Sequence, residues 1–344
     1  MEERNLMGQN ANQMAATPQK LVDDLWAAWR AQVFATAVNL NVFTHIAAGK
    51  RTVKEIARAA EASTKGIERL LNALVGMGYL NKKGDTYGLE PVADAFLVRG
   101  KETYMGDMAY SMTMLWDTWA KLTEVVKTGR PVHAVDVDKD GREFFPKLVS
   151  AIFPGSFAAG RAAAASLPEK TRRGIKNILD VAAGSGAWSL AFASMIPDAQ
   201  VTVLDFPEVT PITRQFVERF GMTDRYSYIE GNLREVNFGR DRYDLVILGH
   251  IIHSEGEKWG KKLIKKSYGA LKEGGMLLIA EMVPNDTRTG PWMPLIFALN
   301  MLLHTEQGDV FTMREYREWL KEAGFKKVKT IEAPAPSPLI LATK

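Results

Sequence analysis

The feature that most constrains this chain is a buried strand, a glycine turn that opens a helix, and a second strand that ends in a carboxylate. The first strand, Asn177–Val181, carries Asp180 and leads into a Gly-Ser-Gly turn at 184–186, and Asp205 follows the second strand. In an open α/β sheet such a turn lets the backbone approach a nucleoside, and the acid accepts hydrogen bonds from the ribose hydroxyls. The turn lacks the third glycine of the dinucleotide-binding fingerprint Gly-x-Gly-x-x-Gly. The sequence therefore predicts a nucleoside site of another kind.

Strands and helices alternate from this turn to the end of the chain. Such alternation predicts a mostly parallel sheet with helices on both faces. The expected strands are 177–181, 200–204, 226–230, 243–248, 275–280, 326–331 and 339–343. The expected helices between them are 187–195, 208–220, 256–272 and 312–323.

The first hundred residues predict a smaller, helical unit. Thr52 and Ser63 each precede a short apolar-periodic segment, as helix N-caps do, and an alternating stretch around Gly84 predicts a hairpin. Three helices followed by a two-stranded wing form a winged-helix unit. Its second capped helix carries too few cations for a DNA-binding face, whereas the apolar helix with Trp26 and Trp29 favours a dimer interface.

Composition excludes several classes of protein. The chain has 344 residues, no cysteine and a net charge of +4, so disulfides, thiolate catalysis and Cys-ligated metals are excluded. Charges of both signs interleave, which predicts no nucleic-acid partner. No apolar run approaches the ~20 residues of a membrane span, and the polar N-terminus is not a secretory signal. We expect a cytoplasmic protein without a membrane partner.

The chain resembles the S-adenosylmethionine (SAM)-dependent small-molecule O-methyltransferases typified by the plant caffeate and bacterial polyketide enzymes. The resemblance runs from about Leu21 to Lys344. The matching motifs are Leu179-Asp-Val-Ala-Ala-Gly-Ser-Gly186, Leu204-Asp-Phe-Pro207, Gly231-Asn-Leu233, Ile252-His253 and Leu271-Lys-Glu-Gly-Gly-Met-Leu-Leu278. It implies a Rossmann-like α/β sheet of seven mostly parallel strands with an N-terminal all-α winged-helix domain.

The resemblance also implies a domain organisation for the chain. A flexible arm (1–18) precedes a winged-helix dimerisation domain (19–100), through which we expect a homodimer. A helical linker and substrate-lid region (101–172) leads into the SAM-binding methyltransferase domain (173–344). The expected product of the cofactor is S-adenosylhomocysteine (SAH).

Cofactor-binding residues are implied by position in the family's motifs. Asp205 would hold the ribose diol, Phe206 would lie near the adenine, and Asn232 would stand where the family usually has aspartate. A lysine often found at the position of Gly249 is missing here. The full expected set is Asp180, Ala182, Gly184, Gly186, Asp205, Phe206, Asn232, Leu233, Gly249 and His250.

His253 falls where the family keeps its catalytic histidine, and we expect it at the end of the fourth strand. A hydroxyl is a poor nucleophile until a base removes its proton, and histidine as a residue type suits that task near neutral pH. Glu306 or Asp309 would be its acidic partner. The Asp and Trp that usually follow the histidine are replaced here by Ser254 and Glu255.

The acceptor pocket would be built from aromatic, apolar and polar residues of two segments. Asn300 and His304 are four residues apart, so they share one helix face. The expected substrate-binding residues are Trp116, Phe153, Trp292, Phe297, Asn300, Met301 and His304.

Three alternatives stay open at this point. His250, His253, His304, Glu255 and Asp309 could supply metal ligands, but a His-x-x-His that leaves a strand puts its imidazoles on opposite faces unless the chain turns there, so we expect no metal. A thioether or amine acceptor loses no proton, so an S- or N-methyltransferase could work by proximity and orientation alone. A non-catalytic SAM- or DNA-binding regulator is the remaining possibility. The sequence leaves the acceptor unnamed.

Overall fold

The computed structural model describes residues 18–101, 103–132, 134 and 140–344. Its contacts divide the chain into two units, one ending at Thr113 and the other beginning at Met114, and each is described here by itself. The predicted flexible arm lies outside the described residues except for Pro18. The four-part division of the sequence stays a prediction.

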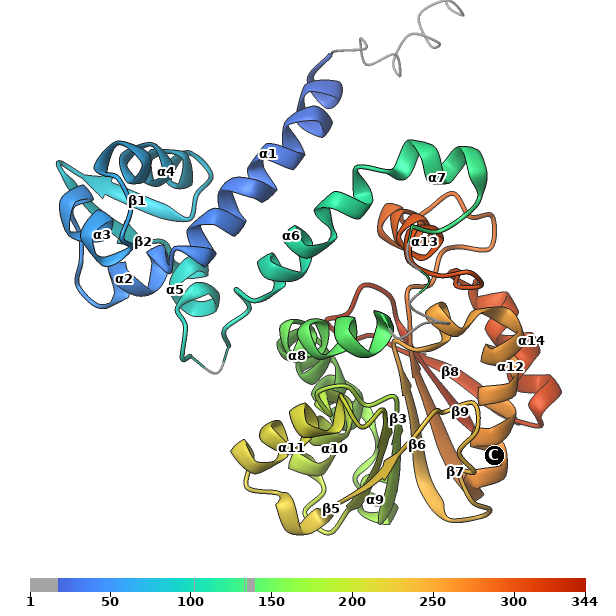
Figure 1. Cartoon of the computed structure of the whole chain (residues 1–344). Helices are drawn as coiled ribbons and strands as arrows, with labels where there is room; N and C mark the ends of the chain where they lie inside the picture. The colour runs from blue at the N-terminus through green and yellow to red at the C-terminus, as the bar shows by residue number, and fades with distance from the viewer. Residues whose placement is uncertain (1–17, 102, 133, 135–139) are drawn as a thin grey trace, which may run out of the picture. The chain divides into compact units, whose positions relative to one another are not determined.

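The first unit is the expected winged helix (Figure 1). Its elements are α1 (Gln19–Asn39), α2 (Val42–Ala47), α3 (Val53–Ala59), α4 (Thr64–Gly76), β1 (Leu80–Lys83), β2 (Thr86–Leu89) and α5 (Pro91–Leu97). Both predicted caps are confirmed: Thr52 and Glu55 form a reciprocal capping box, and the Ser63 hydroxyl accepts a hydrogen bond from the Gly66 amide at 3.1 Å. β1 and β2 pair antiparallel as the predicted hairpin.

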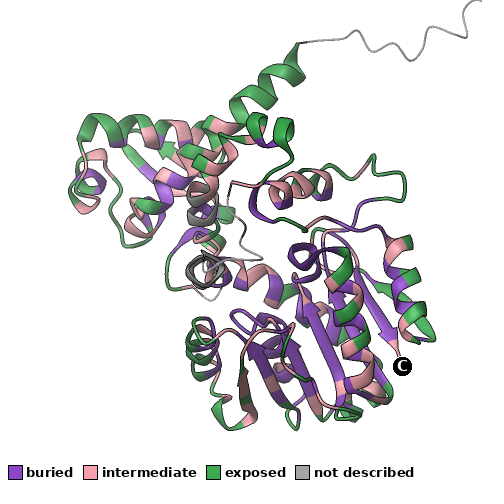
Figure 2. Ribbon diagram, turned by 45° about the vertical axis from the view of Figure 1, so that its right-hand side comes forward, coloured by how far each residue is buried: buried purple, intermediate pink, exposed green. Residues whose placement is uncertain are grey.

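The core of this unit is apolar, built around side chains such as Ile56, Leu71 and Leu74. The first half of α1 is different, because its large apolar side chains face solvent: Leu25 is 75% exposed and Trp29 is 64% exposed. Figure 2 shows this end of the helix as exposed. The unit therefore has a well-packed interior and an uncovered apolar helix.

A run of helices leads to the sheet: α6 (Met108–Trp119), α7 (Leu122–Thr128), α8 (Asp140–Ser166) and α9 (Glu169–Gly174). One stretch of α8, Leu148–Ser166, is long and apolar enough to cross a membrane by composition alone. Ala159, Ala163 and Ala164 from this stretch are buried with residues of the sheet. Core packing thus accounts for its apolar character.

The second unit contains the predicted seven-stranded sheet. Its strands are β3 (Asn177–Val181), β4 (Gln200–Asp205), β5 (Tyr226–Glu230), β6 (Tyr243–Gly249), β7 (Leu271–Ala280), β8 (Lys327–Ile331) and β9 (Leu339–Thr343). The order is β5-β4-β3-β6-β7-β9-β8. The first five run parallel, and β9 is antiparallel to both of its neighbours.

Helices cover both faces of this sheet, as Figure 1 shows. They are α10 (Ala187–Met195), α11 (Thr210–Arg219), α12 (Ile252–Ala270), α13 (Trp292–His304) and α14 (Met313–Ala323), with a 3-10 turn at Thr223–Arg225. Residues of α12 and α14 form one buried cluster with the strands, and residues of α8 and α10 form another. The prediction of helices on both faces of the sheet is confirmed.

The start of α12 differs from the expectation in one respect. The helix begins at Ile252, not at 256, because a separate first turn precedes a break at Gly256. Gly256 has φ 73°, and a Cβ there would overlap the backbone carbonyl of Gln307. Only glycine fits this break. His253 therefore lies in a helical turn after β6 and not at the end of the strand.

Candidate functional site

The candidate site lies at the carboxyl ends of the central parallel strands. β3 has β4 on one side and β6 on the other. β4 and β5 are added on one side of β3 and β6 and β7 on the other, so the strand order switches between β3 and β6. Ligands of open α/β sheets bind in the crevice at such a switch point. Asp205 ends β4, His253 lies in the helical turn after β6, and Glu281 directly follows β7.

Asp205 ends β4 and is bound by the backbone of the glycine turn. The Gly184 amide donates to its Oδ2 at 2.7 Å, and the Phe206 amide donates to its Oδ1 at 2.7 Å. Burial raises the pKa of this carboxyl to about 6, although the two backbone hydrogen bonds oppose the rise. Each carboxylate oxygen keeps a further acceptor lone pair, which suits a pair of ligand hydroxyls.

Asp180 lies below the same turn and is closed to solvent. Its Oδ2 accepts the Ser189 amide at 3.2 Å, while its Oδ1 has no hydrogen-bond partner among the described residues. Burial raises the pKa of Asp180 to about 7, and the charge of Asp205 adds to the rise. This side chain thus fixes the first turn of α10, and its assignment to the cofactor stays a prediction.

The other residues predicted to bind the nucleoside differ in how far they are buried and in their hydrogen bonds. Ala182 has φ 52° and donates from its amide to the Leu204 carbonyl at 2.8 Å, which fixes the exit of β3. Phe206 is half-buried. Asn232 is also half-buried, and its Oδ1 accepts the Arg234 amide. Leu233 is buried in the core under the sheet.

His253 and Glu281 form a buried pair. Nδ1 of His253 lies 2.6 Å from Oε2 of Glu281, whose Oε1 accepts the Ile252 amide at 2.7 Å. Burial raises the pKa of Glu281, but the electrostatic effect of the His253 and His250 imidazoles and the hydrogen bonds from His253 outweigh it, so the pKa lies below its usual value. An ionised carboxylate only accepts. His253 therefore carries its proton on Nδ1 and leaves Nε2 as an acceptor.

Sequence reasoning missed Glu281 and expected Glu306 or Asp309 in its place. That expectation is corrected by the structure: the amide of Asp309 donates to the carbonyl of His253 at 2.9 Å, and its carboxylate accepts the Val310 amide. Glu306 is exposed. A sequence signal for Glu281 did exist, because it directly follows the apolar end of β7 at the ligand-binding edge.

His250 lies between Trp188, which follows the glycine turn, and His253. It has φ 59°, and its ring centroid is 5.8 Å from that of Trp188 and 6.2 Å from that of His253. Burial lowers the pKa of His250 to about 4, so its imidazole is neutral at physiological pH.

The two histidines were expected on opposite faces of a strand unless the chain turned there, and the chain does turn at His250, which has φ 59°. Ligand atoms of His250, His253 and Glu281 lie within 4.8 Å of one another. Their short Nδ1–Oε2 hydrogen bond already engages two of the three.

The predicted substrate residues divide into two groups. Phe297 meets His253 edge-on, with ring centroids 4.9 Å apart, and the Asn300 side chain accepts from the Trp119 indole at 3.1 Å. The imidazole Nδ1 of His304 lies 2.9 Å from the Asn300 carbonyl. Phe297, Asn300 and His304 lie on α13, as do the buried Met301 and the exposed Trp292. Trp119 and the exposed Trp116 lie on α6.

Phe153 belongs to a different environment. Its ring stacks on Phe216 at 4.2 Å and on Phe157 at 5.4 Å, within an aromatic cluster of α8 and α11. Packing accounts for Phe153 without a substrate.

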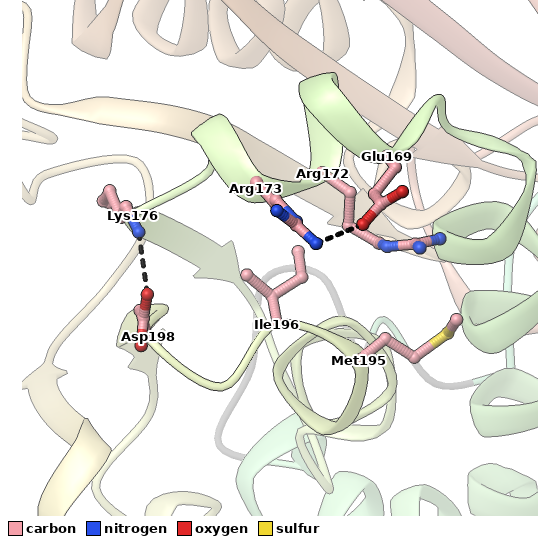
Figure 3. A pocket seen from close by; sticks show the side chains of 7 residues that line it. All are labelled: Glu169, Arg172, Arg173, Lys176, Met195, Ile196 and Asp198. Carbon is pink, nitrogen blue, oxygen red and sulfur yellow. Dashed lines mark hydrogen bonds and ion pairs between the residues drawn. The ribbon is translucent and has the colours of Figure 1, made fainter.

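A surface hollow of about 460 Å³ lies elsewhere, and Figure 3 shows its lining. Lys176 precedes β3 and Asp198 precedes β4, so the hollow is at the amino edge of the sheet. Four of its charged side chains are exposed and paired, Lys176 with Asp198 and Arg173 with Glu169. The fifth, Arg172, is half-buried and donates to the Ala164 carbonyl. This hollow is not part of the candidate site.

Two family models match the chain. The model of the O-methyltransferase domain matches residues 163–326, and the model of the O-methyltransferase dimerisation domain matches residues 25–99. The first contains all of the carboxyl-edge residues described above.

Individual relatives match over nearly the whole length. The 3-hydroxy-5-methyl-1-naphthoate 3-O-methyltransferase of Streptomyces sahachiroi is 29% identical over 93% of this chain and 92% of its own. The tetracenomycin polyketide synthesis 8-O-methyl transferase of Streptomyces glaucescens is 28% identical over 95% and 97%. Human N-acetylserotonin methyltransferase, solved in complex with SAM, has the same fold with a TM-score of 0.81, at 24% identity over 98% of this chain and 99% of its own.

Proposed function

The chain belongs to the SAM-dependent small-molecule O-methyltransferases, and from this premise we propose that it methylates a hydroxyl of an aromatic acceptor with His253 as the general base. The observation that carries the proposal is the His253–Glu281 pair at the ligand-binding edge, with Nδ1 and Oε2 2.6 Å apart. The relatives named above methylate hydroxyl groups of a naphthoate and a polyketide product, which supports an aromatic acceptor.

The residues of the carboxyl edge fit the nucleoside part of SAM. Asp205 is buried, its two oxygens each keep acceptor capacity, and the backbone of the glycine turn holds it in place. We assign it to the ribose hydroxyls, with the loop around Asn232 beside the adenine. Bound SAM supplies a methyl group on a sulfonium sulfur, which an in-line nucleophile can displace.

His253 would remove the proton that makes the acceptor a poor nucleophile. Its Nε2 is the free acceptor of the ring, because Nδ1 faces Glu281 and no described residue bonds Nε2. As the hydroxyl proton moves to Nε2, the ring becomes positive, and the buried Glu281 carboxylate stabilises that charge. The proton later leaves His253 for solvent.

The helix α13 would place the acceptor against this base. Phe297 stands edge-on to the imidazole, an arrangement in which an aromatic acceptor can pack beside His253. Asn300 and His304 lie on the same helix, one turn apart, and offer polar groups for orientation.

Transfer of labelled methyl from SAM to a panel of phenols, hydroxy acids, thioethers and amines tests the proposal. We expect a phenolic acceptor to be best, and His253→Ala to lower kcat by about 10²–10⁴-fold while SAM binding, followed by calorimetry, is retained. His45→Ala is the matched control, since His45 lies on α2 of the other unit. Near-full activity of His253→Ala, or a thioether as best acceptor, would contradict the base assignment.

We also propose that two copies of the chain pair through α1. The match to the dimerisation domain begins at residue 25, and the exposed apolar side chains Leu25, Trp26 and Trp29 lie on this helix. Exposed clusters of this kind mark protein interfaces.

A further inference from the structure

Trp188 is a buried aromatic residue of the site that the proposed chemistry does not yet use. It lies in the first turn of α10, directly after the glycine turn, and is only 4% exposed. Its indole packs on Gly249, the last residue of β6: a Cβ at Gly249 would overlap the ring and lie 2.5 Å from Nε1. Gly249 therefore has no room for a side chain because the indole takes that space.

A second observation concerns the hydrogen bond that the indole N–H of Trp188 can donate. Among the residues that the structure describes, no acceptor bonds Nε1 of Trp188. The atom is also not sealed off, since it is absent from the buried polar atoms that lack a partner. An indole nitrogen only donates, so an oxygen acceptor from a ligand would satisfy it.

The strand order indicates which part of the cofactor comes to this place. Asp205 ends β4, and the Asn232 loop follows β5 on the far side of it. Trp188 and Gly249 lie in the opposite direction, over β3 and β6. A nucleoside with its ribose at Asp205 and its adenine towards β5 thus extends its 5′ substituent towards Trp188. In SAM that substituent is the amino-acid portion.

We propose that the Trp188 indole N–H donates a hydrogen bond to the carboxylate of the cofactor's amino-acid portion. Being a donor only, it cannot serve the ammonium group of the same portion. The assignment rests on the SAM dependence of the enzyme. It also explains how the chain does without a cationic side chain at Gly249, where the indole leaves no space for one.

Binding of two ligands to the full chain, measured by calorimetry, tests this assignment without any turnover. SAH carries the amino-acid portion, and 5′-methylthioadenosine has the same nucleoside but lacks the carboxylate. Trp188→Phe keeps an aromatic ring and removes the N–H. We expect it to weaken SAH about tenfold to a hundredfold, as for loss of a hydrogen bond to a charged group, and to leave 5′-methylthioadenosine unchanged.

Two further variants sharpen the result. Gly249→Ala displaces the indole, so it should weaken SAH and spare 5′-methylthioadenosine in the same way. Trp319→Phe is the matched control, because Trp319 is equally buried at 4% but belongs to α14; it should change neither affinity. Equal weakening of both ligands by Trp188→Phe, or no change in SAH affinity, would overturn the assignment while wild-type binding of SAH leaves the proposed function standing. Failure of the wild type to bind either ligand would overturn both.

Discussion

The two units of the chain differ in the kinds of side chain that they bury. Every buried polar or charged residue among those described belongs to the second unit, from Ser156 onwards. In the first unit the described interior is apolar, yet α1 exposes Leu25 and Trp29. The second unit thus takes charges out of water and the first does not, whereas both expose some large apolar side chains, Leu25 and Trp29 on α1 and Trp292 on α13.

Each of these arrangements costs free energy in the isolated chain. Burying a carboxylate penalises its charged form, as the raised pKa values of Asp180 and Asp205 show. Exposed apolar area likewise forgoes about 25 cal/mol per Å² that burial would return. The difference is consistent with the two proposals above, a cofactor at the carboxyl edge of the second unit and a second copy of the chain against α1 of the first.

The largest effect is expected at Glu281. Glu281→Gln removes the charge that stabilises a protonated His253, so kcat should fall by about 10²–10⁴-fold, with SAH binding retained. Rates with the best acceptor and calorimetry with SAH measure the two quantities. Glu273→Gln is the control on the same strand, since Glu273 is exposed and pairs with Lys326. An unchanged kcat would contradict the proposal, because this buried carboxylate would then serve only folding.

The next effect is expected in the first unit. Trp29→Lys puts a charge into the proposed interface and should raise the dimer dissociation constant by about 30- to 10³-fold, the range for loss of an aromatic anchor. Sedimentation equilibrium measures the constant. Trp292→Lys is the control, since Trp292 is 67% exposed but lies on α13. A wild-type chain that sediments as a monomer would contradict the proposed interface on α1.

A smaller effect is expected at Asp205. Asp205→Asn removes the charged acceptor and turns amide hydrogens towards the backbone donors of Gly184 and Phe206. We expect SAH and 5′-methylthioadenosine to bind about 10- to 100-fold more weakly, because both carry the ribose. Asp198→Asn, at the amino edge of the sheet, should change neither affinity.

The smallest effect concerns stability and pH. The pKa of Asp180 is raised to about 7 in the fold from 3.8, so the folded state holds the proton more tightly than the unfolded state does. Its contribution to stability is present below pH 4 and is lost as pH rises towards 7. The melting temperature of the ligand-free chain should therefore fall between pH 5 and pH 8.

Asp180→Asn should flatten that slope and raise the melting temperature at pH 8, by about 2–4 °C for each kcal/mol recovered. Differential scanning calorimetry across this pH range measures both. A slope that Asp180→Asn leaves unchanged would contradict the role given to this carboxyl. The comparison would be sharpened if no substitution of an acidic residue in the first unit altered the slope.

Much of this architecture could be predicted from local patterns. The strands around Asp180 and Asp205, the caps at Thr52 and Ser63, and the covering helices follow from periodicity and short-range chemistry. The partner of His253 could not be predicted in this way. Glu281 reaches it because β7 lies beside β6 in the sheet, and that adjacency joins residues 28 apart.

The turn at His250 shows the same limit. A histidine with φ 59° is uncommon, and no local pattern distinguishes it from a continuing strand. That single residue changes where His253 lies and brings the two imidazoles near each other. The packing of Trp188 on Gly249 likewise joins residues that are far apart in the sequence.

The loop after α13 positions His253 by main-chain contacts. The Asp309 amide bonds the His253 carbonyl, a Cβ on Gly308 would meet that same carbonyl, and the carbonyl of Gln307 fills the space over Gly256. Main-chain atoms are common to all residues. A substitution of an exposed side chain in this loop, such as that of Glu306, therefore leaves the contacts that position His253 in place.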